Sequence, residues 1–175
     1  KLPDSFDFKI PDKEKLGIGY FNFSDKGFGD FRELSKSLAW NYHKGSRLQW
    51  VSENEIIYNS SKDGKLYSEL LNTDTMKVRK MDFPIDSISS KKMLASSFSY
   101  SRLEFCMPGY GYASKFDEGY LEESISKNTG LFLIDLQSNT RKLLVSIYDV
   151  FNKMGIKDED NAFYFMTHTE FSRSS

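Results

Sequence analysis

The chain has 175 residues, a formal net charge of -1 and 39% hydrophobic residues. This apolar content is enough for a core, and the near-zero charge gives no electrostatic reason to bind nucleic acid or an anionic membrane. No apolar run approaches the ~20 residues that span a bilayer, and no signal peptide is visible. The single cysteine, Cys106, excludes an internal disulfide. We therefore expect a soluble globular protein with no nucleic-acid partner and no membrane span.

The aromatic content indicates β-structure. Phe and Tyr account for 25 residues and Trp for only 2, and such side chains favour half-buried pleated surfaces. The first strand-like pattern begins at Gly17 and stops at the turn composition Asp25-Lys-Gly27. Residues 31–35 are then expected to return as the second strand of a hairpin.

Two sets of four short strands follow, each predicting one antiparallel meander sheet. In the second set, a connection over 103–129 separates the second strand from the third. A further strand is expected from Phe163. The strands of the two complete sets are predicted at 48–52, 55–59, 66–71 and 77–83, and then at 87–90, 93–100, 130–135 and 140–145.

Internal repetition of about 40 to 50 residues favours a β-propeller over a β-sandwich. Leu70-Leu-Asn-Thr-Asp-Thr75 parallels Leu133-Ile-Asp-Leu-Gln-Ser138: two apolar residues, an Asn or Asp, and a turn closing on Thr or Ser. The Asn or Asp side chain can cap such a turn by accepting from the backbone two residues on. A second parallel links Ile88-Ser-Ser-Lys91 with Phe171-Ser-Arg-Ser174. The fold expected is an all-β partial propeller of four-stranded meander blades, with boundaries at 1–36, 46–84, 86–145 and 163–175.

These repeats resemble those of TolB-like and oligogalacturonate-lyase-like propellers, in which Phe-Ser-Pro-Asp-Gly opens a blade and Asp-x-x-Thr-Gly-Lys closes it. The Pro, Asp and Gly of the opening signature are absent here. A longer stretch, with Ala39–Trp50, Phe98–Leu103 and Pro108–Tyr112, is similar to a group of bacterial propeller proteins often encoded near polysaccharide genes. The resemblance covers residues 17–175 and implies a fold, with no established activity attached.

One segment departs from the β pattern. Ile147, Phe151 and Met154 fall at helical spacing, Ser146 with Asp149 resembles a capping box, and Gly155 is a natural helix stop. A short helix is therefore expected at 147–154, in the connection that follows the second sheet.

The topology of a meander blade places the long connections on one face. Three long segments, 36–45, 103–129 and 146–162, are expected there, and long loops on a rigid scaffold concentrate binding residues. The glycines of Gly109-Tyr-Gly-Tyr112 free the backbone to turn, and the tyrosine rings suit sugars; filling the gap beneath the loop is an equal alternative. The candidate ligand-binding residues on this face are Trp40, Asn41, His43, Arg102, Tyr110, Tyr112, His168 and Glu170.

His168 is also a candidate metal ligand. His168-Thr-Glu-Phe-Ser172 resembles the His-x-x-Phe-Ser start of metal-bearing strands in oligogalacturonate lyases, and in a strand His168 and Glu170 would share a face. A structural hydrogen bond is the alternative role for His168. Arg102 can clamp a carboxylate or form a salt bridge to nearby acids.

Two functions are compatible with these residues. The first is a binding propeller that recognises a carbohydrate or a protein on its long-loop face. The second is a metal-assisted lyase that cleaves a uronan by β-elimination, which needs a divalent metal or Arg to neutralise the uronate and a base such as His43. Binding is favoured, because the lyase needs residues that this chain does not contain.

Too few sheets are present to close a ring. An open arc leaves strand edges that invite pairing. We therefore expect the chain to be marginally stable or to associate unless further blades, absent from this sequence, complete it.

Overall fold

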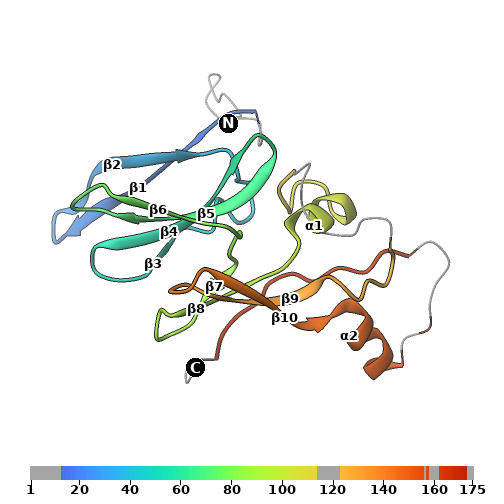
Figure 1. The fold of residues 1–175 in the computed structure, drawn as a ribbon. Coiled ribbons are helices and arrows are strands. Elements are labelled where there is room, and N and C mark those ends of the chain that lie inside the picture. Colours follow the sequence, from blue (N-terminus) through green and yellow to red (C-terminus); the bar gives the residue numbers. More distant parts are fainter. Residues whose placement is uncertain (1–12, 114–122, 156, 158–161, 173–175) are drawn as a thin grey trace.

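The computed structural model describes residues 13–113, 123–155, 157 and 162–172 of the chain. Within them the protein is mostly antiparallel β-sheet, as expected from the sequence, with a two-stranded sheet, two four-stranded sheets and two short helices (Figure 1). None of these sheets closes on itself.

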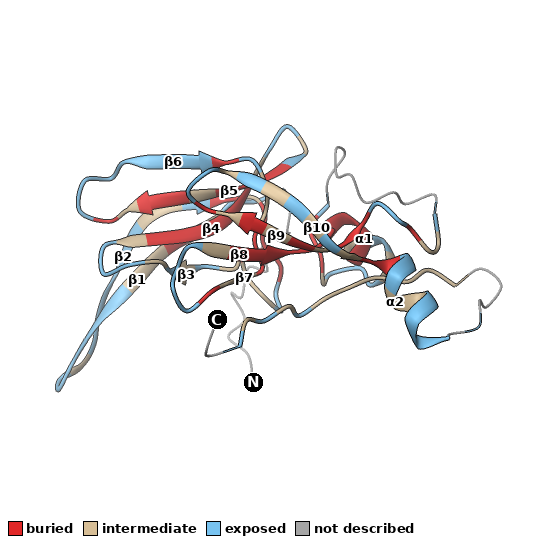
Figure 2. Cartoon of the chain, turned by 60° about the horizontal axis from the view of Figure 1, so that its bottom comes forward, coloured by how far each residue is buried: buried red, intermediate tan, exposed pale blue. Residues whose placement is uncertain are grey.

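The N-terminal hairpin is longer than the sequence pattern indicates. Strands β1 (Leu16–Ser24) and β2 (Gly27–Ser37) pair antiparallel around the expected turn. One face of this hairpin packs on the next sheet through Ile18 and Leu34, which contact a buried cluster containing Ile56 and Leu71. The end of the hairpin near the turn is exposed (Figure 2).

The two four-stranded sheets have the predicted strand order. The first sheet runs β3-β4-β5-β6 and the second is built from β7, β8, β9 and β10 in the same sequential way. The prediction is therefore confirmed at the level of consecutive meanders. Their bounds are β3 (Gln49–Trp50), β4 (Glu55–Lys62), β5 (Lys65–Asn72), β6 (Val78–Met81), β7 (Ser87–Ile88), β8 (Leu94–Ser97), β9 (Gly130–Asp135) and β10 (Thr140–Ser146).

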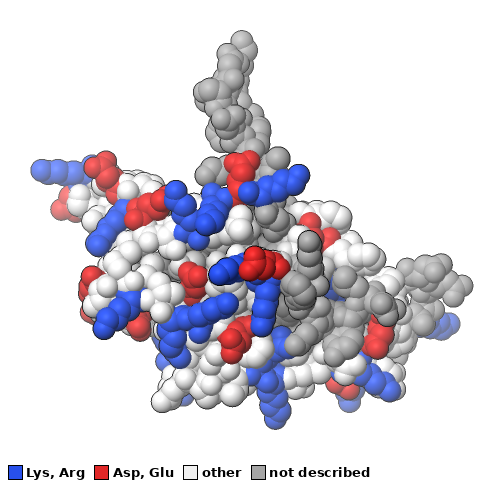
Figure 3. Space-filling model, turned by 45° about the horizontal axis from the view of Figure 1, so that its top comes forward, with Lys and Arg blue, Asp and Glu red and all other residues white. Residues whose placement is uncertain are grey.

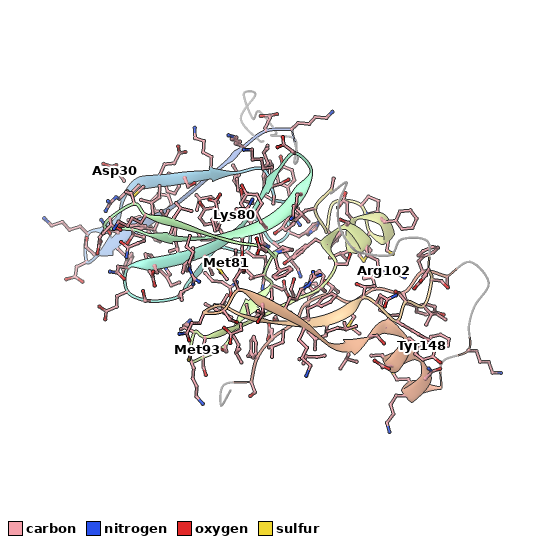
Figure 4. The ribbon with its side chains drawn as sticks, in the orientation of Figure 1. Asp30, Lys80, Met81, Met93, Arg102 and Tyr148 are labelled. Carbon is pink, nitrogen blue, oxygen red and sulfur yellow. The ribbon has the colours of Figure 1, made fainter. Side chains whose placement is uncertain are left out.

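A single apolar core joins the two four-stranded sheets. Ile57, Leu70 and Met81 of the first sheet lie in one buried cluster with Ala95 and Ile134 of the second. Figure 2 shows these central strands as the buried part of the molecule, and Figure 4 shows Met81 on the side of its sheet that faces Met93. The sheets therefore stack in chain order, with the hairpin outside the first.

The predicted repeat is visible in the turns that close both sheets. The Asn72 Oδ1 accepts from the amides of Asp74 and Thr75, at 3.2 and 2.8 Å. The Asp135 Oδ1 accepts from the amides of Gln137 and Ser138, at 2.9 and 2.8 Å. The predicted capping by an Asn or Asp side chain is therefore confirmed at both turns.

Helix α1 (Tyr100–Cys106) is an element that the sequence reasoning missed. The expected strand over 93–100 ends at Ser97, because the Ser99 hydroxyl accepts from the Arg102 amide and starts a helix instead. Neither α1 nor the second helix has the length and apolar character that crossing a bilayer requires, in the part of the chain described here.

The strand expected from Phe163 is not formed in residues 162–172. His168 has a φ of 55°, a left-handed conformation that interrupts a strand. Two backbone groups of this segment bond to side chains: the Tyr164 carbonyl accepts from Arg102 and the Thr169 amide donates to Asp86. The Tyr164 amide donates to the Ser124 carbonyl at 3.4 Å. The segment therefore lies against the second sheet without joining it. Residues 173–175 of the predicted blade lie outside the described chain.

Helix α2 (Ile147–Met154) is confirmed, with the predicted capping box at its start and Gly155 in a left-handed conformation at its end. The hydrogen bonds from Ser146 lower the pKa of the Asp149 carboxyl. Ser146→Ala should lower the free energy of unfolding by about 1 kcal/mol, because it removes the acceptor for the Asp149 amide.

The Ser146→Ala prediction can be checked by urea unfolding, with Ser52→Ala, an exposed turn serine, as the control. Because the pKa of Asp149 is lower in the folded state, its contribution is present above the ordinary carboxyl pKa and is lost as the pH falls through the lowered value. The difference between wild type and Ser146→Ala should therefore shrink in acid. A difference that stays constant down to pH 2 would contradict the capping box as its source.

Candidate functional site

Loops far apart in the sequence meet at one edge of the two four-stranded sheets. The Asn41 Nδ2 donates to the carbonyls of Tyr110 and Gly111, at 2.9 and 3.0 Å. The Tyr112 hydroxyl donates to the Gly45 carbonyl at 2.9 Å. These bonds fix the loop after β2 to the loop after α1, as expected for connections on one face.

The Gly109-Tyr-Gly-Tyr112 motif is held rigidly by helix α1. The Glu104 carboxylate accepts from the amides of Gly109 and Gly111, at 2.9 and 3.0 Å. A Cβ at Gly111 would fall on the Tyr100 carbonyl and 2.8 Å from the Glu104 Cβ, so only glycine lets the loop lie this close to the helix.

The two tyrosines of this motif have different surroundings. Tyr112 is 1% exposed and stacks on Tyr100, with ring centroids 4.3 Å apart. Tyr110 is half-buried and stacks on exposed His43, with centroids 3.8 Å apart. Tyr112 therefore fills the space beneath the loop, whereas Tyr110 and His43 form a flat aromatic pair at its surface.

A fully buried carboxylate, Asp86, lies beneath these loops. Its Oδ1 is 3.0 Å from the Arg47 Nε and 3.5 Å from the Lys44 Nζ. The Tyr100 hydroxyl donates to the same oxygen at 3.1 Å, and the amide and hydroxyl of Thr169 donate to Oδ2 at 2.7 and 2.8 Å. Asp86 therefore joins the loop before the first four-stranded sheet, helix α1 and the C-terminal segment.

The cations of this cluster are unequally exposed. The side chain of Lys44 is 5% exposed and that of Arg47 is 26% exposed. Burial lowers the pKa of Lys44, and the charge of Asp86 offsets part of this shift. Burial also raises the pKa values of Tyr100 and Tyr112, so both hydroxyls remain protonated donors. The charge cluster formed by Asp86, Lys44 and Arg47 therefore has a structural role.

The sequence analysis does not predict this cluster, although the internal repeat contains a pattern that marks Asp86. In the repeat that aligns Ile88 with Phe171, Asp86 and Thr169 occupy equivalent positions, two residues earlier. The two residues bond to each other, so equivalent positions of successive repeats meet. A polar residue before the first strand of each repeat is the pattern that could have identified Asp86.

Arg102 is used for structure. It is 1% exposed, and it donates from Nε to the Tyr164 carbonyl at 2.6 Å and from Nη2 to the carbonyls of Glu123 and Ser124, at 2.7 and 2.6 Å. Burial lowers the pKa of its guanidinium, which stays protonated in proteins. Figure 4 shows Arg102 of α1, whose side chain bonds to the segment leading to the C-terminus.

The other predicted site residues lie around this cluster. Trp40 is buried, and its indole Nε1 donates to the Glu14 carbonyl at 2.7 Å. His168 and Glu170 are exposed, on either side of Thr169, which contacts Asp86. The His168 Nδ1 lies 3.0 Å from the Thr167 hydroxyl. Among the described residues, no three His, Cys, Asp or Glu side chains gather closely enough to hold a metal.

A groove of about 580 Å³ opens beside the Arg102 contacts. It lies between the end of the 103–129 connection and α2, two of the segments expected on the loop face. Tyr148 is 37% exposed, and the Lys127 ammonium lies 4.3 Å from the centroid of its ring. The groove is lined by Glu123, Ser124, Ile125, Lys127, Asn128, Tyr148, Phe151 and Asn152.

Searches against protein-family models, curated proteins and solved structures find no match for this chain. The resemblances noted from the sequence therefore stay predictions, and the function is inferred from the geometry alone.

Proposed function

We propose that the protein is a propeller-type binding module whose loop face recognises a carbohydrate. Three observations support the propeller: two consecutive four-stranded meanders, a shared core between them, and the same Asn or Asp turn in both. In such folds the rigid sheets position variable loops, and ligands bind where the loops meet.

The groove between the 103–129 connection and α2 carries the proposal. Its volume lies in the range of small-ligand sites. The Tyr148 ring offers an aromatic surface, and Asn128 and Asn152 bring side-chain amides that can donate to and accept from hydroxyl groups. One acid, Glu123, and one base, Lys127, give its described lining no net charge. This combination suits an uncharged saccharide better than a uronan.

The lyase alternative receives less support. Its proposed carboxylate clamp, Arg102, is buried and donates to three backbone carbonyls. His43 is exposed and stacked on Tyr110. A lyase would therefore need another group to neutralise the carboxylate of the uronate.

Glycan-array screening followed by calorimetry tests this proposal. Tyr148→Ala should weaken binding of the best saccharide roughly twofold to tenfold, because contact with one aromatic ring contributes about 0.5 to 1.5 kcal/mol. Asn152→Ala should weaken it by a smaller factor. Trp50→Ala removes an aromatic side chain that is 44% exposed on β3, a strand that contributes no residue to the groove, and it should leave the affinity unchanged.

Two results would overturn the proposal: no binding of any saccharide on the array, or equal affinities of wild type and Tyr148→Ala. Binding that depends on His43 instead of Tyr148 would move the site to the aromatic pair formed with Tyr110. A protein ligand captured in the absence of saccharide binding would favour the protein-recognition alternative.

A further inference from the structure

The N-terminal hairpin carries apolar side chains on both faces. Its inner face packs on the first four-stranded sheet through Ile18, Tyr20 and Leu34. Its outer face carries four phenylalanines that are 44 to 78% exposed. A β-ribbon with two apolar faces is typical of an internal layer, whereas a surface ribbon alternates apolar and polar faces. The exposed phenyl face consists of Phe21, Phe23, Phe28 and Phe31.

The phenyl face is preorganised. Cross-strand pairing sets Phe21 opposite Phe31 and Phe23 opposite Phe28. The ring centroids are 5.1 Å apart in the first pair and 5.3 Å apart in the second, and Phe21 lies 6.1 Å from Phe28. The four rings therefore form one continuous cluster before any partner binds.

Glycine at position 19 keeps this face flat. A Cβ there would lie 2.9 Å from the end of the Phe31 ring and would fall on the Arg32 carbonyl. Gly19 thus lets Phe31 lie across the neighbouring strand. A flat aromatic face suits contact with another sheet face.

We propose that the phenyl face binds the same face of a second copy of this chain, in a two-fold symmetric dimer. With aromatic side chains of roughly 200 Å² each, the exposed parts of the four rings amount to about 500 Å² per copy. Two copies would bury about 1,000 Å², the lower limit for a specific interface. A two-fold dimer uses the same patch twice and is the commonest oligomer.

Charges at the two ends of the hairpin permit this arrangement. The turn end carries Asp25 and Lys26, and the other end carries Glu33 and Lys36, whose side chains are 3.4 Å apart. In an antiparallel stack, the turn end of one hairpin lies over the opposite end of the other. Each end carries both a positive and a negative side chain. Figure 3 shows acidic and basic side chains interspersed over this part of the surface. Such a mixture does not favour an anionic membrane as the partner.

Sedimentation equilibrium of the full chain tests the dimer. We expect a concentration-dependent monomer–dimer equilibrium, and Phe23→Asp or Phe28→Asp should weaken association by roughly thirtyfold or more. Phe105→Asp is the matched control, because Phe105 is 56% exposed on α1, and it should leave association unchanged. Thermal unfolding of each variant confirms that its fold is retained.

A cross-link tests the symmetry. In a Cys106→Ser background, Phe21→Cys places the single thiol near the centre of the phenyl face, so a two-fold contact should yield a disulfide dimer on mild oxidation. The proposal fails if the wild type is monomeric at all concentrations, if association survives the Asp substitutions, or if the thiol does not cross-link. Co-sedimentation of a monomeric wild type with phosphatidylcholine vesicles would assign the face to lipid.

Discussion

Asp86→Asn should lower the free energy of unfolding by about 3 kcal/mol, a large part of the stability of a typical domain. The asparagine keeps the shape of the side chain but removes the charge that compensates Lys44, whose side chain is only 5% exposed. It also weakens the bonds from Tyr100 and Thr169. Urea unfolding followed by tryptophan fluorescence, to which the buried Trp40 contributes, measures the loss.

The matched control is Asp82→Asn, since Asp82 is an exposed carboxylate that accepts from Asn139 at 2.8 Å; its effect should stay below about 1 kcal/mol. Adding Lys44→Met to Asp86→Asn should recover part of the lost stability, because the buried cation is then gone. If the double variant is no more stable than Asp86→Asn alone, the uncompensated charge of Lys44 is not the cause of the lost stability.

The effect of Asp86→Asn should also depend on pH. The pKa of Lys44 is already below its ordinary value of 10.5, and removing Asp86 removes a cause that raises it. Between the lowered pKa and 10.5 the unfolded chain then binds more protons at this site than the folded chain, so stability rises with pH. The deficit of the variant should therefore shrink between neutral pH and pH 10. A stability deficit that stays constant over this pH range would contradict the attribution of the loss to the charge of Lys44.

Arg102→Lys should destabilise the protein by about 2 to 4 kcal/mol, although it conserves the charge. The guanidinium donates to carbonyls of two separate segments, and a lysine ammonium cannot reproduce that fork. Carbonyls left without their donor in a buried place add to the loss. Denaturant unfolding gives the total effect, and hydrogen exchange should show faster exchange at 123–129 and 162–166.

Arg79→Lys is the control for this change. Arg79 also donates to two backbone carbonyls, Leu136 and Gln137, but it is exposed. Its replacement should cost less than about 1 kcal/mol, because water can satisfy both carbonyls. Equal losses for the two lysine variants would mean that burial does not determine the role of Arg102.

Period-two patterns and turn residues were sufficient to predict the sheets. β4, β5 and β9 combine apolar runs with short polar turns, and local chemistry at Asn72 and Asp135 sets those turns. The capping box at Ser146 and Asp149 predicted α2, because the residues that start this helix are also close together in the sequence.

The missed features depend on contacts between distant residues. Helix α1 has only seven residues, so its stability comes from packing and from the Ser99 cap rather than from helix propensity. Pairing of Asp86 with Lys44 and Arg47 depends on the sheets stacking. The candidate residues Asn41, Tyr110 and Tyr112 come together as expected. The sequence context of Arg102 predicts ligand binding, because it does not reveal that the side chain is buried.

The hydrogen bonds between Thr169 and Asp86 determine which contacts of Asp86 form last during synthesis of the chain. The two residues are 83 positions apart. When Asp86 leaves the ribosome, Lys44 and Arg47 are already present, so the charged pairs can form as soon as the second sheet begins to assemble. The Oδ2 of Asp86 must then rely on water until Thr169 arrives. Nascent chains halted before Thr169 should therefore hold an accessible carboxylate where the finished protein has a fully buried one.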